Sequence, residues 1–196
     1  GVHIVPSGEV VAQSRTRLLT RAADNLGFAD WVHANRDYFQ GLKSTLSGAI
    51  LFGEWCGKGI QKRTSVSKVD RQIFAVFAIQ YGDHDKQSAR LDIAPERIAA
   101  ILPPHPDIFV LPWYGSPITF DFSNRDKLTQ MAERINQMVH EVERVDPWVS
   151  EVFGLEGTGE GLVMYPIDAL LEDASGPIER ESCTTWMFKA KGEKHQ

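Results

Sequence analysis

Seven short runs rich in Val, Ile, Leu or Phe constrain the fold of this chain more than any other feature. Each has the length and composition of a β-strand, and together they occupy residues 2–5, 9–13, 48–54, 73–80, 108–113, 161–165 and 185–190. The first two flank Pro6-Ser7-Gly8, which predicts a hairpin with a tight turn. Helical patterns interrupt the runs at irregular intervals. This order favours an α+β fold with mainly antiparallel sheets and flanking helices over a regular parallel α/β fold.

Three segments carry helical signals. The clearest is 124–145, where Ser123 is predicted to cap the helix and Asp126 follows three residues later. Its apolar residues recur at three- and four-residue steps: Leu128, Met131, Ile135, Met138, Val142 and Val145. A second helix is predicted over 28–42, and a third over 95–102, which begins at Pro95 and is followed by two prolines.

The composition is that of a globular protein and excludes several classes. The 196 residues are 42% hydrophobic and 24% charged, which is enough to bury a core in about one domain. A net charge of -5 argues against a protein that coats nucleic acid nonspecifically, although a local basic cleft can coexist with an acidic body. No run has the length of a transmembrane helix, so no membrane partner is expected. Cys56 and Cys183 match no ligand spacing, which predicts a reduced intracellular location, in the cytoplasm.

The last strand-like run ends in a pair of lysines, Lys189 and Lys191. Alternate residues of a strand project to the same face, so these two ammonium groups would lie side by side while Phe188 and Ala190 face the other way. Two adjacent cations require an anion, which makes the pair a candidate binding site. The alternative is a solvated strand face or a protected sheet edge.

Five segments in order resemble the motifs of the covalent nucleotidyltransferases. They are Ser14-Arg15-Thr16, then 51–61, 73–79, 159–164 and finally Lys189-Ala190-Lys191. The Gly-Glu-aromatic-x-Gly-x-Gly-Ile-Gln run at 53–61 is the most specific, and the set is similar to that of RNA ligases of the phage nick-sealing and kinetoplastid editing type. The resemblance implies one nucleotidyltransferase (ATP-grasp-like ligase) adenylylation domain over residues 1–196. It implies an ATP-dependent RNA ligase, with a role in RNA repair, that joins RNA 5′-phosphate and 3′-hydroxyl ends through lysine-AMP and RNA-adenylate intermediates.

The resemblance gives the candidate site residues their roles. Lys189 and Lys191 would meet the charge that develops on the α-phosphate of ATP. Phe77 would stack on the adenine, or else simply pack in the core. Glu54 would accept hydrogen bonds from the ribose hydroxyls, or else be a surface carboxylate at a strand end.

Two further roles concern phosphate and metal. Arg15 resembles the arginine that contacts the nucleotide or the substrate 5′-phosphate, although it could be a surface residue and the neighbouring Arg17 leaves the choice between the two open. Glu160 follows a glycine-bearing segment and enters a strand, where one carboxylate could hold a hydrated Mg²⁺ or Mn²⁺. Gly57-Lys58-Gly59 lacks the P-loop sequence and is interpreted as a turn.

One motif of the family is missing from the sequence. The nucleophilic lysine belongs to a Lys-x-x-Gly motif before the arginine motif, and no such motif precedes Arg15. We therefore expect the nucleophilic lysine just upstream of Gly1, in a segment that the sequence lacks. Three alternatives stay open: a catalytically inactive pseudo-ligase that binds nucleotide or RNA, a DNA ligase, and a capping guanylyltransferase.

Overall fold

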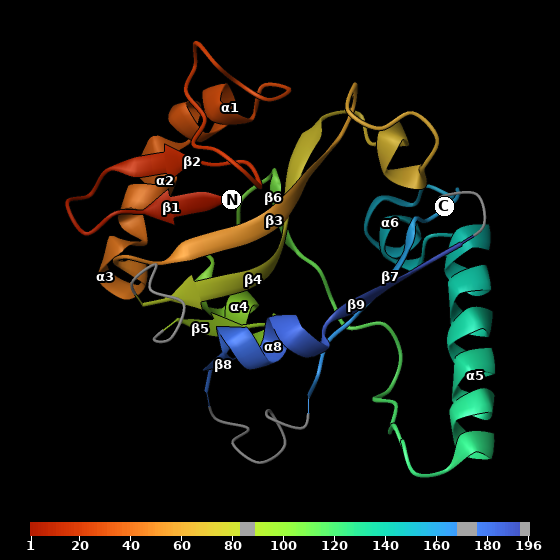
Figure 1. Ribbon diagram of the computed structural model, residues 1–196. Helices are drawn as coiled ribbons and strands as arrows, with labels where there is room; N and C mark the ends of the chain where they lie inside the picture. The colour runs from red at the N-terminus through yellow and green to blue at the C-terminus, as the bar shows by residue number, and fades with distance from the viewer. Residues whose placement is uncertain (83–88, 168–175, 193–196) are drawn as a thin grey trace. The chain divides into compact units, whose positions relative to one another are not determined.

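The computed structural model describes residues 1–82, 89–167 and 176–192 and divides into two compact units (Figure 1). The first unit comprises Gly1–Trp55, Ile73–Leu111 and Ala169–Thr185. The second comprises Cys56–Gln72, Pro112–Asp168 and Trp186–Gln196. The chain enters and leaves each unit more than once, and each is described by itself below.

A seven-stranded sheet forms the first unit, and its strands run in the order β2-β1-β3-β4-β5-β8, with β6 also paired to β4. All pairs with a defined register are antiparallel except β4 with β6, which is parallel. The strands are β1 (Val2–Ile4), β2 (Val10–Ala12), β3 (Ile50–Gly57), β4 (Gln72–Tyr81), β5 (Arg90–Asp92), β6 (Ile108–Val110) and β8 (Ile178–Glu179). The predicted α+β class with mainly antiparallel sheets is confirmed, as is the hairpin around Pro6-Ser7-Gly8.

The predicted helix over 28–42 is two short helices instead of one, and a third short helix follows it directly. They are α1 (Phe28–Ala34), α2 (Arg36–Gly41) and α3 (Lys43–Leu46). The first break falls at Asn35, which leaves the helical conformation at φ -102 and ψ 19 while its side-chain amide donates to the carbonyl of Trp31. Competition of this kind between an asparagine side chain and the helix backbone is a common reason for a helix to end. The helix predicted after Pro95 is confirmed as α4 (Pro95–Ile101).

Aromatic side chains from the helices and the sheet form the core of the first unit. The ring of Phe28 lies 5.3 Å from those of Phe74 and Trp55, and Phe39 and Phe74 are fully buried. Gly53 makes room for this packing, because a Cβ at that position would lie 2.6 Å from Cε2 of Phe74. Packing against Phe74 therefore requires a glycine directly before Glu54.

The described end of the first unit was not predicted from sequence. Strand β8 and helix α8 (Arg180–Trp186) follow residue 176, and β8 pairs with β5. Buried Asp92 accepts 2.7–3.1 Å hydrogen bonds from the guanidinium of Arg97, which also donates to the carbonyl of Gly176 at 3.2 Å. The strand predicted over 185–190 was wrong at its start, since α8 continues to Trp186 and the strand begins at Phe188.

The second unit is built around the long helix α5 (Arg125–Arg144), which confirms the helix predicted over 124–145. The predicted cap was wrong by one residue. Asn124 accepts a hydrogen bond from the amide of Lys127, whereas Ser123 donates to Asp121. Asp146 then caps α6 (Pro147–Phe153), and the remaining elements are the 3-10 helix η1 (Ser65–Lys68), β7 (Gly161–Met164) and β9 (Phe188–Lys191).

Strands β7 and β9 form a two-stranded antiparallel ribbon that packs on α5, as Figure 1 shows. Leu162, Met164 and Ala190 of the ribbon pack against a buried row on α5 that consists of Met131, Ile135 and Val139. One face of the ribbon is thus used for folding. Across the described ranges, no helix combines the length and the apolar character needed to cross a membrane.

Candidate functional site

Glu54 and Phe77 lie on the same face of the sheet in the first unit. Strands β3 and β4 are neighbours, and Gly53 and Phe74 face each other on the core side. Side chains alternate between the two faces along a strand, so residues an odd number of positions apart point to opposite faces. Glu54 is one residue after Gly53 and Phe77 is three residues after Phe74, so both point away from the core side. The residues predicted to hold the ribose and the adenine therefore lie on one face of two neighbouring strands.

The surroundings of Glu54 leave its carboxylate accessible. Its side chain is exposed, and the next residue, Trp55, is held by a 2.9 Å hydrogen bond from its indole nitrogen to the carbonyl of Leu26. The nitrogen of Gly1, directly before β1, lies near the carboxylate of Glu54. A positioned and accessible carboxylate of this kind is suited to accept hydrogen bonds from hydroxyl groups.

Phe77 is less buried than both of its neighbours in the middle of β4. Val76 and Ala78 are 0% and 3% exposed, whereas Phe77 is half-buried. A central strand normally buries an apolar residue at every position when both faces are covered. The exposed part of the ring is a surface on which a planar group could stack. The buried part is also compatible with packing in the core.

Arg15 lies at the tip of a tight turn that follows β2. The hydroxyl oxygen of Ser14 accepts hydrogen bonds from the amides of Thr16 and Arg17, and Gln13 and Leu18 are bridged across the turn. Both Arg15 and Arg17 are exposed, and neither forms an ion pair with another described residue. The choice between the two arginines therefore stays open.

Lys189 and Lys191 belong to the second unit, where they point to one face of the ribbon. Lys189 is paired across the strands with Val163 and Lys191 with Gly161, while Ala190 packs toward α5. The side chains on this face of the ribbon are exposed: Lys189, Lys191 and Val163. The prediction that the two lysines share one strand face is confirmed, and their role toward a phosphate stays a prediction.

Glu160 is held at the start of β7 by a segment with three closely packed glycines. Gly157 lies against Ser65, Gly159 against Val142, and Gly161 (φ +132) against the backbone of β9 at Ala190. A Cβ on Gly159 would lie 2.8 Å from the carbonyl oxygen of Val142, so a larger residue would displace the segment.

Backbone hydrogen bonds hold the same segment from both sides. The carbonyl of Gly157 accepts from the amide of Asp146 and that of Thr158 from the amide of Ser65, both at 2.8 Å. The amide of Gly159 donates to the carbonyl of Val142 at 3.0 Å. Glu160 itself is exposed, so a rigid backbone presents its carboxylate to solvent directly before the strand that pairs with the two lysines.

Glu160 offers a metal ion a single carboxylate and not a set of several protein ligands. Among the residues that the structure describes, no group of three or more His, Cys, Asp or Glu side chains is arranged to hold a metal. Magnesium keeps several of its waters and commonly uses one or two protein carboxylates together with substrate phosphates. The exposed and rigidly placed Glu160 fits this mode of binding.

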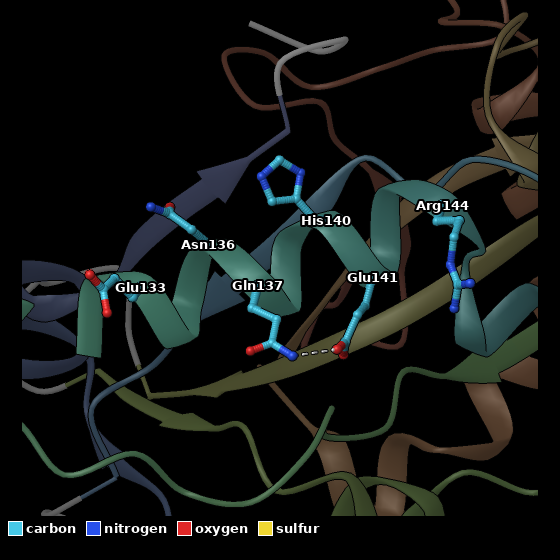
Figure 2. A pocket seen from close by; sticks show the side chains of 6 residues that line it. All are labelled: Glu133, Asn136, Gln137, His140, Glu141 and Arg144. Atoms are coloured by element: carbon cyan, nitrogen blue, oxygen red, sulfur yellow. Dashed lines mark hydrogen bonds between the residues drawn. The ribbon is translucent and has the colours of Figure 1, made fainter. Parts of the chain in front are cut away.

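A groove along one face of α5 is lined by none of the predicted site residues. Figure 2 shows that its lining comes from that helix alone, with Gln137 donating a 3.2 Å hydrogen bond to Glu141. The lining residues are Glu133, Asn136, Gln137, His140, Glu141 and Arg144. Ligand pockets usually enclose most of a ligand between several elements, so this one-helix groove is no candidate for the nucleotide.

Sequence reasoning missed a basic loop between β3 and β4. Gly57 (φ +108) and Gly59 (φ +82) form the predicted turn, since the amide of Ile60 donates to the carbonyl of Gly57. The loop that continues from this turn carries Lys58, Lys62 and Arg63 on its surface. A local count of charges would have found it, because residues 56–72 contain five basic residues and one acidic one.

Comparison with known proteins identifies the family of the chain. The RNA ligase family model matches residues 1–182, which include Arg15, Glu54, Phe77 and Glu160 and exclude the two lysines of β9. No curated protein and no solved structure matches the chain.

Proposed function

The chain belongs to the RNA ligase family, and from this premise we propose that it is an ATP-dependent ligase that joins RNA 5′-phosphate and 3′-hydroxyl ends. The observation that carries the proposal is the family match over residues 1–182, within which Glu54 and Phe77 share one face of the sheet. The phage nick-sealing and kinetoplastid editing type is part of the proposal.

Three group transfers make up the proposed reaction. A lysine amine attacks the α-phosphorus of ATP, forms a P–N bond to AMP and releases pyrophosphate and a proton. The RNA 5′-phosphate oxygen then displaces the lysine, which leaves with a proton, and takes up AMP. The 3′-hydroxyl finally attacks the 5′-phosphate, forms the phosphodiester and releases AMP and a proton.

The residues of the chain would divide these tasks by chemistry. Phe77 offers a ring face to adenine, and Glu54 accepts hydrogen bonds from the ribose hydroxyls. Lys189 and Lys191 supply fixed positive charge where negative charge develops on the phosphoryl oxygens. Arg15 offers a planar guanidinium to phosphate oxygens.

Glu160 would hold a Mg²⁺ or Mn²⁺ ion together with water and the phosphates of ATP. Such an ion, when bound, lowers the electrostatic cost of charge on the phosphoryl oxygens. The role of the protein is to hold one anionic oxygen, that of Glu160, at a defined position. The close packing of Gly157, Gly159 and Gly161 supports this role.

The test is to map the AMP adduct on the full-length protein. Incubation with labelled ATP and magnesium is expected to label a lysine upstream of Gly1, because no Lys-x-x-Gly motif precedes Arg15. Peptide mass spectrometry locates the adduct. An adduct on a lysine within residues 1–196 would show that the nucleophile is misassigned, and no adduct at all would favour a pseudo-ligase. Labelling by GTP in preference to ATP would point to a capping enzyme.

Phe77→Ala is expected to weaken ATP binding by more than tenfold with only a small loss of stability, because a half-buried ring leaves little cavity when it is removed. Calorimetric titration with ATP and thermal melting measure the two effects. The control is Phe74, a fully buried phenylalanine on the same strand. Phe74→Ala should cost roughly 3–5 kcal/mol of stability. If Phe77→Ala loses as much stability and keeps its ATP affinity, Phe77 is a core residue.

A further inference from the structure

The basic loop, residues 58–71, connects β3 to β4 and concentrates positive charge in an acidic chain. It contains five basic residues and one acidic residue, a formal charge of +4, whereas the whole chain carries -5. The basic residues are Lys58, Lys62, Arg63, Lys68 and Arg71, and the acidic one is Asp70. A local excess of this size attracts polyanions even when the net charge of the protein is negative.

Several contacts fix the base of the basic loop within the second unit. The amide of Lys58 donates to the carbonyl of Arg71 at 3.1 Å, which closes the neck of the loop. The amide of Ser65 donates to the carbonyl of Thr158 at 2.8 Å, and Val69 is 2% exposed. The loop is therefore a folded element whose surface side chains start from defined positions.

The five cations fall into two groups. The ammonium of Lys68 donates to the carbonyl of Glu156 at 2.6 Å, and the guanidinium of Arg71 lies 3.2 Å from Asp70, so these two already have partners. Lys58, Lys62 and Arg63 are exposed, and within the described ranges none of the three forms an ion pair. The hydroxyl oxygens of Thr64 and Ser65 are closed off from solvent, so a ligand would meet the three cations first.

We propose that Lys58, Lys62 and Arg63 bind the phosphate backbone of the RNA substrate. The proposal rests on the proposed function for the identity of the polyanion. Cations that are already exposed and unpaired bind phosphates without first breaking ion pairs, and each contact releases counterions from the nucleic acid. The loop contains no aromatic residue on which a base could stack, so the contact is to the backbone and independent of base sequence.

The salt dependence of RNA binding tests this assignment. The full-length protein is titrated into a fluorescein-labelled, 5′-phosphorylated single-stranded RNA at several KCl concentrations, and anisotropy gives the affinity. K62A/R63A is expected to lose about tenfold or more in affinity at low salt. The slope of log affinity against log salt should become shallower by about 1.4, since each phosphate contact to a single strand contributes about 0.7.

Two further variants make the result specific. R125A/R134A removes two exposed cations from α5 in the same unit and should stay within about twofold of wild type. The charge-preserving K62R/R63K should keep the wild-type slope, because backbone phosphates respond to charge. A K62A/R63A protein with wild-type slope and affinity would overturn the proposal, as would an equal loss in R125A/R134A.

The binding assay contains no ATP, so its result is separate from that of the adduct experiment. If the wild-type protein forms no AMP adduct, the proposed catalytic function is contradicted. The RNA-binding measurement can still be interpreted in that case. A wild-type protein that forms the adduct and binds RNA with a slope unaffected by K62A/R63A would contradict only the role of the basic loop. Thermal melting of each variant checks that the fold is intact.

Discussion

Replacing Lys189 or Lys191 by alanine is expected to lower the rate of lysine-AMP formation in the full-length protein by about a hundredfold or more. Removing one preorganised donor from a site of developing charge has an effect of this size. Both side chains are exposed on the ribbon face that does not pack on α5, so the melting temperature should change little. Single-turnover labelling with ATP measures the rate, and melting measures the fold.

Lys127→Ala is the matched control for the lysine pair. Lys127 is also an exposed lysine of the second unit, and its ammonium lies 3.0 Å from Asp121 at the start of α5. Its loss should leave adenylylation within about twofold of wild type, since exposed ion pairs contribute little. Near-normal adenylylation in both Lys189→Ala and Lys191→Ala would mean that the pair is a solvated strand face.

Glu160→Gln is expected to lower adenylylation nearly as much as Glu160→Ala and to raise the magnesium concentration that gives half-maximal rate. The amide keeps the shape of the side chain but removes the anionic oxygen that a hard cation prefers. Because Glu160 is exposed, neither change should unfold the protein. Rates measured over a magnesium titration give both quantities.

Glu156→Gln is the matched control for Glu160. Glu156 is exposed in the same glycine-bearing segment, and it holds Lys68 through its backbone carbonyl. This substitution removes one negative charge from the same region and should leave the magnesium dependence unchanged. A Glu160→Gln protein with wild-type rate and magnesium dependence would show that Glu160 does not bind the metal.

The secondary structure of the predicted site could be derived from local patterns. Alternation in Phe188–Lys191 was enough to place Lys189 and Lys191 on one face, because side-chain direction in a strand follows from the backbone alone. The Pro/Gly turn of the first hairpin and the long apolar repeat of α5 were equally local signals. For the strands outside this hairpin, the patterns could not give the partner.

The elements that sequence reasoning missed are short or depend on distant partners. Strand β8 has two residues, and it forms because β5 lies beside it and Arg97 holds the carbonyl of Gly176. The parallel pairing of β6 with β4 joins residues 34 positions apart, such as Phe74 and Ile108, and nothing in either strand alone specifies it. The single helix predicted over 28–42 divides at Asn35, where a side chain competes for the backbone.

By itself the sequence determined the α+β class, the positions of the main strands and helices, and the order of the motifs that resemble those of RNA ligases. These depend on residue type and spacing, which act over a few residues at a time. Only the tertiary structure decided that Glu54 and Phe77 share a face of the sheet and that three glycines hold the backbone on both sides of Glu160. It also showed which cations of the basic loop are exposed and form no ion pair with another described residue, because burial and pairing depend on contacts between segments that are far apart in the chain.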